Sequence, residues 1–107
     1  MQTSYFNNVK NNTQVVSIAV SQPKYLSNVN VFSLLAPRYK LLSDFRKELI
    51  SQDDYVCEYN YYLSKLDPQI VWDSLHEFSS DPIICCHCSV KYFCHRHLVA
   101  EWFEENL

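Results

Sequence analysis

The residues with the clearest chemical potential form the triplet Cys94-His95-Arg96, near the end of the sequence. Apolar residues at helical spacing follow it, so the triplet is predicted to open the last helix. The unpaired N–H groups and the dipole of a helix N-terminus favour a thiolate or a bound anion. Cys94 could therefore supply a nucleophile, His95 a proton carrier and Arg96 an anion-binding group. The structural alternative is that Cys94 packs, His95 caps the helix and Arg96 extends to solvent.

Cysteine and histidine residues around the triplet also have the spacing of metal ligands. The pair Cys85-x-x-Cys88 is followed by Cys94-x-x-His97, and two such pairs are typical of a tetrahedral zinc site. Because a straight strand turns residues three apart to opposite faces, Cys85 and Cys88 converge only if the strand ends between them. The set Cys86, Cys88, Cys94 and His97 is equally consistent with the sequence. Zinc and the absence of any cofactor therefore both stay open.

A cysteine-phosphatase site is disfavoured at the neighbouring dipeptide His87-Cys88. That chemistry would need an arginine at position 94, where this chain has a cysteine, and glycines whose amides face the phosphate. The chain contains no glycine at all. The same absence excludes P-loop and dinucleotide-binding loops, so any anion must be bound by side chains and a helix N-terminus.

The composition indicates a single compact domain over residues 1–107. Hydrophobic residues make up 48% of the 107 positions, which is enough for a core. The net charge of -3, with nine Lys and Arg spread singly, does not indicate nucleic acid as a partner. No apolar run approaches the ~18 residues of a membrane span, and the first residues lack signal-peptide features. We expect a cytoplasmic protein without membrane contact, with its cysteines reduced, and a homodimer is compatible with the sequence.

Alternating strand and helix patterns must position these residues. The β-branched run 15–20 and the apolar run 83–88 predict buried strands, and Tyr5-Phe6 ends a short first strand. A long loop is expected over 21–37, between the strand at 15–20 and the first predicted helix. Helices are predicted over 38–50, 53–66, 67–78 and 94–106, and Leu42, Phe45 and Leu49 fall on one face of the first. The third begins with Asp67 as N-cap and Pro68 in the first turn.

This alternation predicts an α/β fold with a small, mostly parallel sheet flanked by helices in three-layer α/β/α order. The fold would be Rossmann-like but without a Gly-rich loop. Ligands of such sheets bind beyond the carboxyl ends of the strands. The segment 85–97 follows a strand end of this kind, so the functional site is expected there.

The C-terminal segment resembles the signature of a known family. The sequence Ile84-Cys85-Cys86, a step of eight residues from Cys86 to Cys94, and the segment 94–102 are similar to the C-terminal signature of the domain of unknown function 488 family. Weaker similarity extends to 3–6, 35–37, 39–45 and 63–68, and so to nearly the whole chain.

The resemblance implies a small α/β fold and a functional cluster of Cys86, Cys94, His95 and Arg96, but it supplies no activity. This chain differs from the family's pattern in two places. Cys88 stands where the family often has an acidic residue. Many members also have an acidic-Arg pair at the end of the second strand, where this chain has Ile18-Ala19-Val20.

Two functions of different classes follow from these observations. In the first, an uncharacterised pocket protein binds or processes a nucleotide-like or other small anionic molecule. Arg96 and the helix N-terminus would bind the anion, Cys94 or Cys86 would be the thiolate, and His95 the acid or base. In the second, a non-enzymatic module uses the cluster to bind zinc or only to pack, and its surface binds a protein partner. The missing acidic-Arg pair near Val20 favours the second function.

Overall fold

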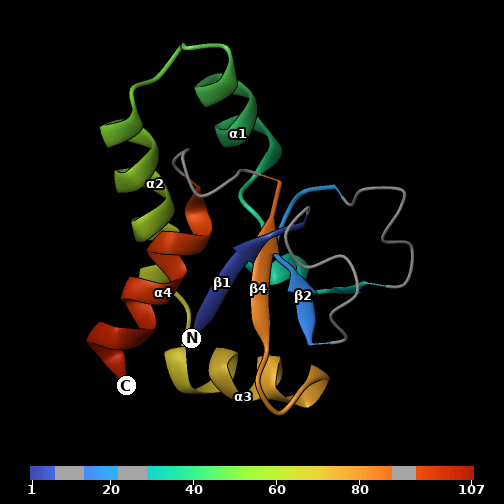
Figure 1. The fold of residues 1–107 in the computed structure, drawn as a ribbon. Coiled ribbons are helices and arrows are strands. Elements are labelled where there is room, and N and C mark those ends of the chain that lie inside the picture. Colours follow the sequence, from blue (N-terminus) through green and yellow to red (C-terminus); the bar gives the residue numbers. More distant parts are fainter. Residues whose placement is uncertain (7–13, 22–28, 88–93) are drawn as a thin grey trace.

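The computed structural model describes residues 1–6, 14–21, 29–87 and 94–107 (Figure 1). Four strands in this part form one sheet: β1 (Gln2–Tyr5), β2 (Val15–Ser17), β3 (Asn30–Val31) and β4 (Ile83–Cys86). Their order is β1-β4-β2-β3, and each neighbouring pair is parallel. Figure 1 shows β4 between β1 and β2. The predicted α/β class with a small parallel sheet is confirmed.

The parallel register brings the strand ends together at one edge of the sheet. Cys85 of β4 lies opposite Ser4 of β1 and opposite Ser17 of β2. Just beyond β2, the backbone N–H of Ile18 donates to the carbonyl of Cys85, 3.0 Å away. The end of β4 and the end of β2 therefore lie side by side, which places Cys86 next to the residues that follow β2.

The described residues also form four helices: α1 (Tyr39–Arg46), α2 (Gln52–Ser64), α3 (Pro68–Phe78) and α4 (His95–Asn106). Residues close in sequence determine where α2 and α3 begin. Ser51 and Asp54 form a capping box on α2, and Asp67 accepts from the backbone of Gln69 and Ile70 to cap α3. In Figure 1, α2 and α4 lie side by side on one side of the sheet. Within the described residues, no helix is both long and apolar enough to cross a membrane.

Side chains from the strands and helices form two buried clusters. The first joins Val16 and Ile84 of the sheet to the inner faces of α2, α3 and α4, through Tyr55, Tyr59, Leu63, Val71, Leu75, Leu98, Val99 and Phe103. The second lies on the alternate strand positions, with Val15, Ile83 and Cys85, and also holds Phe6, Ala19, Cys86 and Cys94. Within the described residues, helices pack on the face of the first cluster. Cys94, at the start of α4, belongs to the second.

Two differences from the sequence prediction concern the region before α2. The predicted loop over 21–37 contains the short strand β3 and a 3₁₀ turn, Ser33–Leu35. Both are too short to show any hydrophobic period. The first helix was predicted to reach position 50, but it ends at Arg46, and Leu49 is 68% exposed rather than on an inner face.

The end of α1 is a Schellman turn built on a non-glycine residue. The N–H of Glu48 donates to the carbonyl of Phe45 over 3.1 Å, and the N–H of Leu49 donates to that of Asp44 over 2.8 Å. Glu48 has φ = 60°, the left-handed conformation that glycine normally supplies at this position. Because the chain has no glycine, this helix stop carries no glycine signal in the sequence.

Replacing Glu48 with glycine should therefore stabilise the protein. A Cβ in left-handed conformation costs about 1–2 kcal/mol, part of which the greater freedom of unfolded glycine offsets, so we expect a gain of about 1 kcal/mol. Urea unfolding would measure it. Lys47→Gly is the matched control. Lys47 has φ = -85°, a conformation in which its Cβ causes no steric strain for glycine to relieve. A loss of stability in Glu48→Gly would contradict the prediction.

Candidate functional site

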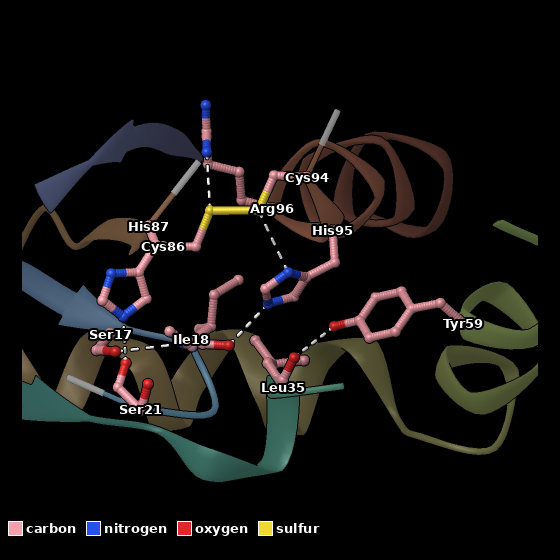
Figure 2. Close-up of a disulfide and its surroundings, with 11 residues drawn as sticks. Ser17, Ile18, Ser21, Leu35, Tyr59, Cys86, His87, Cys94, His95 and Arg96 are labelled. Atoms are coloured by element: carbon pink, nitrogen blue, oxygen red, sulfur yellow. Dashed lines mark hydrogen bonds between the residues drawn. A yellow bond between two sulfur atoms is a disulfide. The ribbon is translucent and has the colours of Figure 1, made fainter. Parts of the chain in front are cut away.

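The end of β4 and the first turn of α4 bring together the four residues Cys86, Cys94, His95 and Arg96 (Figure 2). Cys86 is the last residue of β4, and Cys94 is the N-cap of α4. Their side chains are buried, with exposed fractions of 2%, 6%, 4% and 0% in that order. Because Leu98, Val99 and Phe103 bury the inner face of α4, its first turn is held against the sheet edge. The site is thus built into the core.

The sulfur atoms of Cys86 and Cys94 are joined as a disulfide. The sequence predicted that these cysteines are reduced, so the structure differs from that expectation. The reason is tertiary: the carboxyl end of the central strand and the start of the last helix meet at one sheet edge. Spacing along the chain could not show this. Cys57 and Cys85 remain free thiols in the structure.

His95 is held in one tautomer by the backbone. Its Nε2 lies 2.7 Å from the carbonyl oxygen of Ile18, which can only accept, so Nε2 carries the hydrogen. Nδ1, 3.4 Å from Sγ of Cys94, then has the free lone pair. Burial lowers the pKa of His95 to about 4; the Ile18 hydrogen bond opposes this shift, and the charge of Arg96 adds to it. At neutral pH the ring is therefore an uncharged base that faces a sulfur.

Tyr59 of α2 supports this ring from the other side. Its ring meets that of His95 edge to face, with the centroids 5.4 Å apart. The Tyr59 hydroxyl donates to the carbonyl of Leu35 over 2.6 Å. Burial raises the pKa of Tyr59 well above its usual value, so the phenol stays neutral. Sequence patterns placed Tyr59 in a packing stripe and gave no signal for this supporting contact.

Arg96 directs its guanidinium toward the other sulfur. Nη1 donates to Sγ of Cys86 over 2.8 Å, as Figure 2 shows. Burial of a guanidinium is unfavourable unless acceptors or negative charge face it, and an ionised Cys86 would provide that charge. The positive charge of Arg96 also acts against the burial that raises the pKa of the Cys85 thiol to about 12. Arg96 is thus placed to favour an anionic sulfur at the sheet edge.

A cavity of about 140 Å³ opens over the two sulfurs. Its lining includes Cys86, Cys94, His95 and the exposed His87, together with residues of α1. The α1 residues are Tyr39, Leu42 and Arg46, and the lining is completed by Ala19, Val20, Ser21 and Pro37. Arg96 lies behind the sulfurs and does not belong to the lining formed by the described residues. Sequence analysis missed Arg46 and Tyr39 because only tertiary packing brings α1 to this edge.

Of the predicted zinc ligands, Cys85 and Cys94 lie in the second cluster, whereas His97 is on the exposed side of α4. Sγ of Cys85 lies 3.6 Å from the carbonyl oxygen of Ile83. Cys88 lies outside the described residues. In the described part of the chain, the group able to hold a metal is Cys86, Cys94 and His95, whose ligand atoms lie within 4.8 Å of one another.

Comparison with known proteins gives one match. A family model described as the active DUF488-N3 subclade matches residues 7–107. No curated protein and no solved structure matches the chain. The match covers the whole cysteine, histidine and arginine cluster together with most of the fold, as the C-terminal signature predicted.

Proposed function

We propose, from the premise that this chain belongs to the domain of unknown function 488 family, that its cluster is a thiolate-based active site for a small anionic molecule. One observation carries the proposal. Cys86 and Cys94 both line a cavity, and each sulfur contacts its own activating side chain, Arg96 or His95. A core that needed the cysteines only for packing would not require this pairing.

Cys94 is the sulfur that faces an uncharged hydrogen-bond acceptor and a helix N-terminus. Its neighbour His95 is neutral and has its Nδ1 lone pair on the sulfur side, so it can accept a hydrogen bond from the reduced Cys94 thiol. Cys94 is also the N-cap of α4, and the first turn of that helix contains no acidic residue. The helix dipole therefore supports negative charge at this sulfur without a competing carboxylate in that turn.

Cys86 is the sulfur stabilised by charge. A guanidinium that donates directly to sulfur favours the thiolate over the neutral thiol. Sequence analysis gave Arg96 the role of holding an external anion. Its burial behind the sulfurs supports a different assignment within this proposal, in which the anion facing Arg96 is the thiolate of Cys86.

The cavity sets the size and charge of the substrate group. Liquid water has about 30 Å³ per molecule, so about 140 Å³ admits a small molecule or one group of a larger one such as a nucleotide. Arg46, in the last turn of α1, provides an exposed positive charge on the α1 wall of the cavity. We assign the anionic group of the substrate to that wall.

Alkylation of the reduced protein tests both parts of the proposal. We expect a site cysteine to react faster than the exposed thiol of Cys57, and Arg46→Ala to slow negatively charged iodoacetate about 3–10-fold while leaving neutral iodoacetamide unchanged. Tryptic peptides resolve the sites, because Cys94 is alone in 92–96 and Cys57 in 48–65. Lys40→Ala is the matched control on α1, since Lys40 pairs with Asp44 at 2.9 Å. If Cys57 reacts as fast as every site cysteine, the thiolate proposal fails.

A second candidate function rests on the same three ligand atoms. Sγ of Cys86, Sγ of Cys94 and Nδ1 of His95 could hold a zinc ion with its fourth position toward the cavity. The hydrogen bond from His95 to Ile18 is the kind of support that zinc-bound imidazoles have. Elemental analysis of the reduced, purified protein separates the two functions. Stoichiometric zinc would replace the free-thiolate proposal with a metal site.

A further inference from the structure

We propose that Cys86 and Cys94 are a thiol–disulfide exchange couple, in which an anionic low-molecular-weight thiol bonds to Cys94 and Cys86 is the leaving sulfur. This inference rests on the proposed thiolate site and names its substrate class. It starts from the disulfide that joins the end of β4 to the start of α4. Both cysteines of that disulfide line the cavity, so a small thiol bound there would lie beside them.

Contrast with Cys85 shows that proximity in the strand does not explain the pairing. Cys85 is adjacent to Cys86 in sequence and belongs to the same second cluster as Cys86 and Cys94, yet it has no exposed surface and is a free thiol. Cys86 and Cys94 are instead joined where a cavity, an imidazole and a guanidinium meet. A purely structural disulfide would not need any of these three.

The contacts of the two sulfurs determine which one leaves. Exchange is faster when the leaving sulfur is the more stable thiolate. Arg96 donates to Cys86 over 2.8 Å, whereas Cys94 faces the lone pair of a neutral ring nitrogen. The half charge of the helix N-terminus at Cys94 is weaker than a full guanidinium in contact with sulfur. Cys86 is therefore the better leaving group, and the incoming thiol bonds to Cys94.

The reaction balances with thiols alone. A thiolate RS⁻ attacks Sγ of Cys94, the bond between the two protein sulfurs breaks, and its electron pair goes to Sγ of Cys86 beside Arg96. A second RS⁻ attacks the R sulfur of the mixed disulfide, giving RSSR and the Cys94 thiolate. The two protein sulfurs are reduced and two RSH are oxidised, and the two protons pass to the thiolates or to water. In reverse, the Cys94 thiolate attacks RSSR.

The cavity wall explains the preference for an anionic thiol. The protein has a net charge of -3, so its overall field repels a small anion. Arg46 and the exposed Tyr39 offer a cation and a hydroxyl on the α1 wall of the cavity. A thiol with a carboxylate can place its sulfur against Cys94 while the carboxylate faces this wall. Glutathione is the probe with this chemistry.

Trapping of variants that keep only one cysteine of the pair tests the assignment of the two sulfurs. In a Cys57→Ser, Cys88→Ser background, the Cys86→Ser variant treated with oxidised glutathione should form a mixed disulfide on peptide 92–96. At about pH 10, where both sulfurs are ionised, the matched Cys94→Ser variant should form one on peptide 66–91 about 3–10-fold more slowly, since the thiolate stabilised by Arg96 is intrinsically the less nucleophilic one. Equal or reversed rates would overturn the assignment. Arg46→Ala should slow trapping of Cys94 by oxidised glutathione. An unchanged rate would disprove the preference for an anionic thiol.

The unmodified protein gives an independent measurement if either variant fails to fold. In glutathione redox buffers quenched with acid, non-reducing digestion should show peptides 66–91 and 92–96 linked, and a transient glutathionyl group on 92–96. Absence of the link at every buffer ratio would overturn the exchange couple. If iodoacetate still alkylates the reduced site rapidly in that case, the proposed thiolate function stands alone. If alkylation is also no faster than at Cys57, both proposals fall.

Discussion

Acidification from pH 7 to pH 4 should lower the free energy of unfolding by about 3 kcal/mol through His95 alone. The pKa of His95 falls from its ordinary 6.5 to about 4 on folding. Below pH 6.5 the unfolded chain binds a proton at this ring and the folded chain does not. The stability contributed by the neutral ring is therefore complete above pH 6.5 and is lost progressively as pH falls toward 4. Below pH 4 both states are protonated and the loss is complete.

The surroundings of the ring explain why it resists a proton. Arg96 places a positive charge on the same helix turn, and the sulfur of Cys94 occupies the Nδ1 side, where the added proton would lie. The ring of Tyr59 closes a further side and excludes water. Among these neighbours, the Ile18 carbonyl favours the protonated His95 ring. Burial has the larger effect on the pKa and favours the neutral ring.

Denaturant unfolding at several pH values would measure this effect. We expect His95→Gln, whose amide N–H can still reach the Ile18 carbonyl, to have lost most of the dependence between pH 6.5 and 4. His97→Gln is the matched control on the same helix. Burial also lowers the pKa of His97, but that side chain is largely exposed, so its removal should change the dependence little. Identical pH profiles for the wild type and His95→Gln would disprove the prediction.

Removal of the buried guanidinium should slow alkylation of Cys86 by about 10–100-fold at neutral pH, because an adjacent opposite charge favours the thiolate by that order. The change is Arg96→Met, which keeps a long flexible side chain in the space behind the sulfurs. Replacement of a buried charge by an apolar side chain of similar size is often neutral or stabilising, so the fold should be retained. The reduced protein with Cys57→Ser and Cys88→Ser is the suitable background.

Neutral iodoacetamide is the appropriate reagent, because it separates sulfur activation from attraction of an anion. The rate is measured on peptide 66–91, where the buried Cys85, with a pKa of about 12, contributes little. Arg96→Lys keeps the charge and should recover part of the rate, although an ammonium lacks the planar donor group. An unchanged rate in Arg96→Met, with normal circular dichroism, would show that the guanidinium does not activate Cys86.

The parts of the structure that were predictable are those with local causes. Asp67 and Pro68 mark the start of α3, and the apolar positions after Arg96 mark α4, because caps and helical periodicity depend on neighbouring residues. The cluster of Cys86, Cys94, His95 and Arg96 was predicted from this placement and from the family signature. The structure brings these four residues together.

The parts that were not predictable depend on distant contacts. The contact between His95 and the Ile18 carbonyl joins the start of the last helix to the end of the second strand, and Arg46 reaches the cavity only because α1 packs there. Of the zinc ligands predicted from spacing, Cys85 and Cys94 lie in the second cluster, His97 is exposed on α4 and Cys88 lies outside the described residues, so the four-residue zinc site stays a prediction. The end of α1 was misplaced because Glu48 takes a conformation that sequence patterns assign to glycine.

The order β1-β4-β2-β3 also determines when the protein can fold during synthesis. Among the described strands, β4 leaves the ribosome last, yet it is the shared partner of β1 and β2. Until it emerges, β1 and β2 have no common neighbour, and their unpaired edges and apolar side chains are exposed to other chains. Long-range parallel pairing of this kind is slow. Because Cys86 ends β4, the pairing that completes the described sheet also places Cys86 beside the residues that follow β2.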